Sequence, residues 1–194
     1  MTSEEIRDPH IQGHPSIRRL PDRLLRPIEL GRLVSSVGAD AHLWRRHVRH
    51  DPGERWHARL HWSPTVEVYL LGWEIGQDTR LHDHGGSRGA FFVADGELSE
   101  QYARVGSGTL HERRHPVQTV TPFSADYLHN LGNAGPRLAT SVHAYSPPLS
   151  VMRFYERSRR SGSFIPAYQL PVDGPEPDPS AAPVPVGSAA EATT

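Results

Sequence analysis

Residues 76–86 read Gly76-Gln77-Asp78-Thr79-Arg80-Leu81-His82-Asp83-His84-Gly85-Gly86 and lie between two apolar runs with strand character, at 66–73 and 88–94. Side chains alternate between the two faces of a strand, so His82 and His84 are predicted to point the same way. Two imidazoles on one face are the minimum of a chelate for a borderline transition metal. A chain with 13 histidines can also hold such a pair by chance, so the rest of the sequence must decide.

The composition excludes several classes of protein. A formal charge of −1 gives no basic excess for nucleic acid or an anionic membrane. The chain has no apolar run of about 18 residues, and its polar, acidic start is unlike a secretory signal. Cysteine is absent, so disulfides, thiolate ligands and a cysteine nucleophile are excluded, and a metal must be held by nitrogen and oxygen. We therefore expect a cytoplasmic protein with no nucleic-acid or membrane partner and no obligate protein partner.

The length suggests one domain with tails. Residues 1–22 are polar, carry three prolines and are predicted to form an N-terminal arm. Residues 171–194 hold six prolines and four acidic residues but no basic or aromatic residue, which predicts a disordered tail. The folded domain is expected to span residues 23–170.

Two kinds of periodicity divide this domain. Apolar residues at helical spacing follow Pro27, which suits a first helical turn, and predict helices over 27–37 and 41–47. Predicted strands cover 55–62, 66–73, the histidine stretch, 88–94, 97–105, 109–113, 117–121, 127–131, 138–146 and, as the last one, 151–156. The pair Asp95-Gly96 predicts a hairpin turn. Turn signals recur about every 8–12 residues, which favours an antiparallel sandwich or barrel.

Three polar side chains of the strand at 138–146 form another candidate group. Strand alternation places Ser141, His143 and Tyr145 on one face. If that face is buried, the three groups must satisfy one another by hydrogen bonding. The alternative is an amphipathic strand whose polar face meets solvent.

A β-barrel with a His-x-His pair after a glycine resembles a cupin. Five residues separate Gly76 from His82, and Gly96 stands at the closing glycine of the first cupin motif. The two positions at which common cupins carry a glutamate ligand hold Arg88 and Gly89 here. The usual set of three histidines and one carboxylate is therefore not available from this motif.

The second cupin motif is matched by His129-Asn130-Leu131-Gly132-Asn133, which reads His-x3-Asn, although Ser124 and Asp126 replace its Pro-x-Gly. Together with the Ser-x-His-x-Tyr set, these motifs resemble cysteine dioxygenase, a thiol dioxygenase of the cupin superfamily, over residues 56–145. The resemblance implies a mainly β protein: a cupin (double-stranded β-helix, or jelly-roll) barrel with short N-terminal helices.

The resemblance also implies roles for individual residues. The Fe(2+) ligands would be His82, His84 and His129, and the active-site group would comprise the phenol of Tyr145 with His143 and Ser141 behind it. Arg59, within His57-Ala58-Arg59-Leu60, would hold the carboxylate of the substrate, with Arg55 as the competing candidate. Mammalian members crosslink a cysteine to the tyrosine; this chain has Gly89 at that position, as bacterial members do.

The function implied is oxidation of L-cysteine by O2 to cysteine sulfinate. Three alternatives stay open: a dioxygenase of another small thiol such as 3-mercaptopropionate, a cupin enzyme with a different metal, and a non-catalytic cupin that binds a small molecule or a partner. Arg59 argues against the first and the missing glutamate against the second. Tyr145 with His143 argues against the third.

Overall fold

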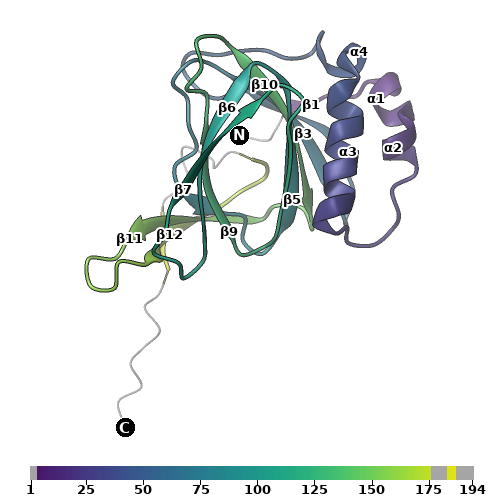
Figure 1. The fold of residues 1–194 in the computed structure, drawn as a ribbon. Helices are drawn as coiled ribbons and strands as arrows, with labels where there is room; N and C mark the ends of the chain where they lie inside the picture. Colours follow the sequence, from purple (N-terminus) through teal and green to yellow (C-terminus); the bar gives the residue numbers. More distant parts are fainter. Residues whose placement is uncertain (1–3, 176–182, 187–194) are drawn as a thin grey trace.

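The computed structural model describes residues 4–175 and 183–186, and two sheets form its barrel (Figure 1). One sheet has the strand order β1-β2-β3-β10-β5-β8, and the other β13-β12-β11-β4-β9-β6-β7. The strands are β1 Glu4–Glu5, β2 His57–Trp62, β3 Glu67–Trp73, β4 His82–Asp83, β5 Arg88–Asp95, β6 Glu97–Arg104, β7 His111–Pro116, β8 Val120–Phe123, β9 Tyr127–Gly132, β10 Ala139–Ser146, β11 Val151–Arg157, β12 Phe164–Pro171 and β13 Val184–Pro185. The helices are α1 Pro9–Gly13, α2 Pro15–Arg18, α3 Pro27–Ala39 and α4 Ala41–Trp44. The mainly β cupin fold predicted from the sequence is confirmed.

The helices cover the outer side of the six-stranded sheet (Figure 1). Helix α3 begins at Pro27, as its sequence predicts, and buries Leu30, Val34 and Val37 against β5 and β10. A second cluster of buried side chains, including Tyr69, Phe91 and Leu131, fills the space between the two sheets. The barrel thus has an interior that is separate from the core beneath the helices.

Gly38 and Gly31, both on α3, offer a test of this packing. A Cβ on Gly38 would lie 2.3 Å from Phe92 Cδ1, so Gly38→Ala should lower the free energy of unfolding by about 1–3 kcal/mol. A Cβ on Gly31 would meet Val120 Cγ2 at 3.6 Å, an ordinary contact. Gly31→Ala should therefore raise stability by up to about 1 kcal/mol, because alanine is the better helix former. Urea unfolding of both variants measures the difference, and equal shifts would contradict the tight contact with Phe92.

The turn at Asp95-Gly96 differs from the predicted hairpin. Gly96 adopts a positive φ of 75°, yet β5 and β6 belong to different sheets. Strand β5 pairs with β10 and β8, whereas β6 pairs with β7 and β9, so neither has a free edge for the other. The turn is a corner through which the chain passes from one sheet to the other.

Both ends of the described chain pack more closely than the sequence suggests. In the predicted N-terminal arm, β1 pairs with β2, and Ile6, Ile11 and Ile17 are buried in the core with α3. Strand β12 was not predicted, because its two prolines weaken a strand signal. The main-chain N–H of Val172 donates to the Ser150 carbonyl oxygen, and β13 pairs with β12, so order extends beyond the predicted boundary at residue 170. The rest of the predicted tail, 176–182 and 187–194, lies outside the described residues.

Candidate metal centre

The three predicted ligand histidines meet in the barrel interior. His82 opens β4 and pairs in register with His129 of β9, and His84 follows β4 directly. One ring nitrogen from each lies within 4.8 Å of the others, and all three side chains are buried. Asp83, between them, points the other way and accepts hydrogen bonds from Arg153 and Tyr155. Strand alternation, from which the shared face was predicted, therefore holds at this site.

The backbone on either side of β4 adopts unusual conformations that fix this arrangement. Arg80 has a φ of 58°, a left-handed value that costs an L residue about 1–3 kcal/mol. Its carbonyl oxygen lies 2.9 Å from His82 Nδ1 and orients that ring. After His84, Gly85 has a φ of 62°, and a Cβ there would lie 2.3 Å from Val151 Cγ1. Only glycine fits at this turn.

The hydrogen bonds of the cluster determine which nitrogens face its centre. A carbonyl oxygen only accepts, so His82 donates from Nδ1 to Arg80 and keeps the lone pair on Nε2. His129 likewise uses Nδ1, 2.9 Å from the Glu100 carboxylate. The Nε2 atom of His84 is buried and has no hydrogen-bond partner among residues 4–175 and 183–186. The cluster therefore offers Nε2 atoms toward a common point.

The electrostatics suit a metal. Burial, and then the proximity of the other histidines, holds the pKa of His82 and of His84 well below the ordinary value. Both imidazoles are therefore neutral, which is the form that binds metal. A buried, unpartnered Nε2 is costly unless something occupies it, and a cluster of imidazole nitrogens is a donor set for a first-row transition metal. The residues present fit a bound divalent metal ion.

The predicted Ser141–His143–Tyr145 group is buried on β10 and internally hydrogen-bonded. Trp73 Nε1 donates to Ser141 Oγ at 2.8 Å, which lies 2.8 Å from His143 Nε2. His143 Nδ1 lies 3.2 Å from the Tyr145 hydroxyl. The arrangement that also satisfies the Ser141 hydrogen has Ser141 donating to His143, and His143 donating to Tyr145. The hydroxyl hydrogen of Tyr145 is then left for a group in the interior.

This relay adjoins the histidine cluster. The ring of Tyr145 lies 5.1 Å from the ring of His84, measured between centroids. Burial, and then the charge of Glu67, raises the pKa of Tyr145 well above its ordinary value, so the phenol keeps its proton. Burial also holds the pKa of His143 well below its ordinary value. Both groups are therefore neutral hydrogen-bond partners, and the solvent-facing alternative for this strand is wrong.

The two candidate arginines have different surroundings. Arg59 on β2 donates from Nε to the Tyr69 hydroxyl at 2.8 Å, and its Nη2 pairs with Asp173 of the C-terminal segment. The Glu67 carboxylate lies 3.9 Å from the same Nε and accepts a hydrogen bond from Tyr69. Arg59 is thus linked to Glu67 and Tyr69, which act electrostatically on Tyr145. The guanidinium of Arg59, however, is already in contact with the Asp173 carboxylate.

Arg55 lies deeper in the fold. Its guanidinium stands 4.6 Å from the Trp73 ring centroid, and its Nη1 donates to the Asp78 carbonyl oxygen at 2.8 Å. Burial lowers the pKa of Arg55 to about 10, and its charge acts on Tyr145, His82 and His143. The structure therefore brings both arginines near the site, one at its edge and one beside the relay.

Glu100 was not predicted as a site residue. The first cupin motif places its carboxylate at residue 88 or 89, whereas Glu100 lies one strand further along the chain. A signal was present: Glu100 shares the inward face of β6 with buried Leu98, where an acid is unexpected. Burial favours a higher pKa for this carboxyl, but hydrogen bonds from His115 and His129 outweigh it and hold its pKa well below the ordinary value.

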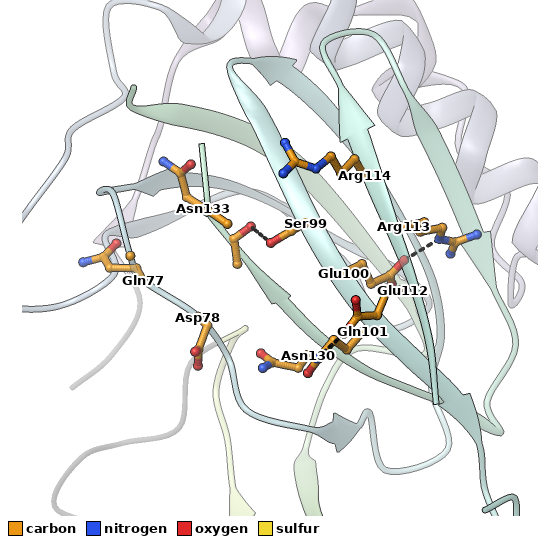
Figure 2. Close-up of a pocket in the computed structure, with 13 residues that line it drawn as sticks. Gln77, Asp78, Ser99, Glu100, Gln101, Glu112, Arg113, Arg114, Asn130 and Asn133 are labelled. Carbon is orange, nitrogen blue, oxygen red and sulfur yellow. Dashed lines mark hydrogen bonds and ion pairs between the residues drawn. The ribbon is translucent and has the colours of Figure 1, made fainter. Parts of the chain in front are cut away.

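A polar groove of about 520 Å³ lies on the outer side of the seven-stranded sheet, which contains β6 and β9 (Figure 2). Ser99, Gln101 and Asn130 line it, and the histidine cluster is not part of its lining. The outward side chains of β6 and β9 alternate with the inward ones that support the site. The groove and the metal centre therefore occupy opposite faces of one sheet.

The chain is similar to one known family and to several solved structures. A model of the family "Cysteine dioxygenase type I" matches residues 28–158, more than half of the chain. Solved structures with a similar arrangement include the protein TT1209 of Thermus thermophilus, with 21% identity, a TM-score of 0.46 and coverage of 53% of this chain and 92% of that one. A Klebsiella pneumoniae protein with a double-stranded β-helix domain shares 20% identity, with a TM-score of 0.45 and coverage of 53% and 85%. The cupin domain of Schizosaccharomyces pombe Cnp3 shares 11%, with a TM-score of 0.43 and coverage of 53% and 66%.

Within the residues that the structure describes, no helix has the length and apolar character needed to cross a membrane. The family match spans the histidine cluster, the relay on β10 and both candidate arginines. The chain belongs to the cysteine dioxygenase type I family.

Proposed function

We propose that this protein is an iron(II)-dependent dioxygenase that converts L-cysteine and O2 to cysteine sulfinate. The observation that carries the proposal is a cluster of three buried histidines, to which the described residues add no carboxylate ligand, next to a buried Ser141–His143–Tyr145 relay. The thiol takes up both atoms of one O2, so R–SH becomes R–SO2H and no other reductant is needed. The family match supports dioxygenase chemistry, and the metal and substrate are our assignment.

The residues of the chain divide the work as follows. Ferrous iron, when bound, would supply a centre at which a thiolate and O2 react. The three imidazoles would hold it without cancelling its charge, since an imidazole binds a metal in its neutral form. Tyr145 would donate its hydroxyl hydrogen to the reacting oxygen or sulfur atoms, and His143 would hold the phenol in place. The ring of Phe123, stacked on His84 at 4.8 Å between centroids, would exclude water from this side.

Oxygen uptake by the iron-loaded protein against a panel of thiols tests the proposal. Cysteine should be the preferred substrate, with one O2 consumed for each sulfinate formed. A preference for 3-mercaptopropionate would show that the substrate assignment is wrong but the chemistry right. No uptake with any thiol at full iron content would favour the non-catalytic cupin.

Tyr145→Phe should lower kcat for cysteine by about 10–100-fold, because it removes one positioned hydrogen-bond or proton donor. Iron content should stay unchanged, since the hydroxyl bonds to His143 and not to a histidine of the cluster. Tyr102→Phe is the matched control, because the Tyr102 ring stacks on His111 of β7 and is not part of the relay. The kcat of this variant should equal that of the parent protein. Full turnover by Tyr145→Phe with full iron content would remove the phenol from the mechanism.

A further inference from the structure

Glu100 is a buried carboxylate whose two oxygens are both occupied. Oε1 lies 2.9 Å from His129 Nδ1 and accepts from the Tyr127 hydroxyl at 2.9 Å. Oε2 accepts from Arg113 Nε at 2.6 Å and lies 2.8 Å from His115 Nε2. Figure 2 shows the link between Glu100 and Arg113, which runs from β6 to β7. Four donors around one carboxylate require it to be ionised and fix it in place.

The contact with His129 distinguishes Glu100 from an ordinary buried ion pair. Each bond to β7 or to Tyr127 joins neighbouring strands, which is what a structural pair would do. The bond to Nδ1 of His129 instead determines the tautomer of a cluster histidine and the direction of its Nε2. For His82 the same role falls to a neutral carbonyl oxygen, that of Arg80. An ionised carboxylate makes the imidazole behind it a stronger donor than a carbonyl does.

We propose that Glu100 is a positioning residue for the metal centre: it holds His129 with Nε2 toward His82 and His84 and increases its strength as a ligand. The carboxylate that the first cupin motif lacks is thus supplied one hydrogen bond away from the metal. Arg113 and His115 hold Glu100 in turn, so the support extends through β7. The inference rests on the metal binding contained in the proposed function, but not on thiol oxidation.

Glu100→Gln in the full chain tests the role. The affinity for Co2+, measured by competition with a chromophoric chelator, should fall about 10–100-fold, as for other lost carboxylate–histidine–metal contacts. The visible absorption of bound Co2+ should also shift, because the His129 ring is no longer held by an anion. Glu97→Gln is the matched control on the same strand: Glu97 pairs with Arg114 of β7 at 2.8 Å, and both side chains are more exposed. Its affinity and spectrum should not change, since exposed pairs contribute little.

A second variant covers the case in which Glu100→Gln does not fold. Glu100→Asp keeps the charge that Arg113 and His115 require but withdraws the carboxylate from His129 by one methylene. The Glu100→Asp variant should fold, but its affinity for Co2+ should be at least about 10-fold lower than that of the parent protein. If the folded variant binds Co2+ with the parent affinity and spectrum, Glu100 only joins strands and the proposal is overturned. The proposal is also overturned if the variant has lower thermal stability without metal but an unchanged affinity for Co2+.

The same measurements separate this inference from the proposed function. If the unaltered protein binds Co2+ and Glu100→Gln weakens that binding, the inference stands even where no thiol is oxidised. If the unaltered protein binds neither Co2+ nor iron, the metal centre itself is wrong, and both proposals are overturned.

Discussion

His84→Ala should lower the affinity for iron(II) or Co2+ by more than about 100-fold. Loss of a residue that hydrogen-bonds to a metal ligand already lowers metal affinity about 10–100-fold, and loss of the ligand itself should lower it further. Thiol oxidation should fall to background with it. His84 gives the clearest test of the three, since its buried Nε2 makes no hydrogen bond to any residue that the structure describes. The substitution therefore removes a ligand without leaving a broken hydrogen bond behind.

Thermal unfolding with and without metal distinguishes loss of binding from loss of fold. A ligand at 100 times its Kd stabilises the native state by about 2.7 kcal/mol, and this increment should disappear in His84→Ala. His61→Ala is the matched control, because His61 on β2 lies outside the cluster and its buried Nε2 also has no partner in the described part of the chain. His61→Ala should retain the whole increment. If His84→Ala retained it as well, the three histidines would not form the metal site.

The sequence predicted the parts of the site that depend on local geometry. Alternation along a strand gives the shared face of His82 and His84 and that of Ser141, His143 and Tyr145, because the period of 2 does not depend on the partner strand. The position of His129 required the family resemblance, since β9 meets β4 only in the folded sheet. The direction of side chains within a strand could therefore be predicted, whereas contacts between strands could not.

Three features that the sequence did not predict depend on contacts between strands or distant segments. Glu100 acquires its role from two neighbouring strands, β7 and β9, and its inward position alone did not identify a partner. Asp95-Gly96 has the sequence of a hairpin turn and a positive φ at Gly96, but the pairing of β5 with β8 and β10 makes it a corner between sheets. The contact between Arg59 and Asp173 joins residues far apart in the chain. No local pattern specifies contacts of this kind.

Arg59→Ala should reduce kcat/KM for cysteine by roughly 10–150-fold, which corresponds to about 1.5–3 kcal/mol for a lost hydrogen-bonded charge pair. A cysteine bound through sulfur and nitrogen leaves a carboxylate that needs a partner in the barrel interior. Arginine can meet it with two parallel hydrogen bonds. Cysteamine has no carboxylate, so its turnover should be low in the parent protein and change little in the variant.

The surroundings of the two arginines favour Arg59 over Arg55 as this partner. Arg55 is stacked on Trp73 and buried, so its bonds are part of the fold. Arg59 instead contacts Asp173, whose side chain is 60% exposed, and a substrate carboxylate could replace that of Asp173 without disrupting the core.

Asp173→Asn supplies the control for Arg59→Ala. If Arg59 only anchors the C-terminal segment, both variants should lose the same activity toward cysteine and cysteamine. If Arg59 binds substrate, Asp173→Asn should leave activity toward cysteine equal or higher, because removing the internal carboxylate frees the guanidinium for the substrate. Loss of cysteine selectivity in Arg55→Ala, with selectivity intact in Arg59→Ala, would transfer the role to Arg55.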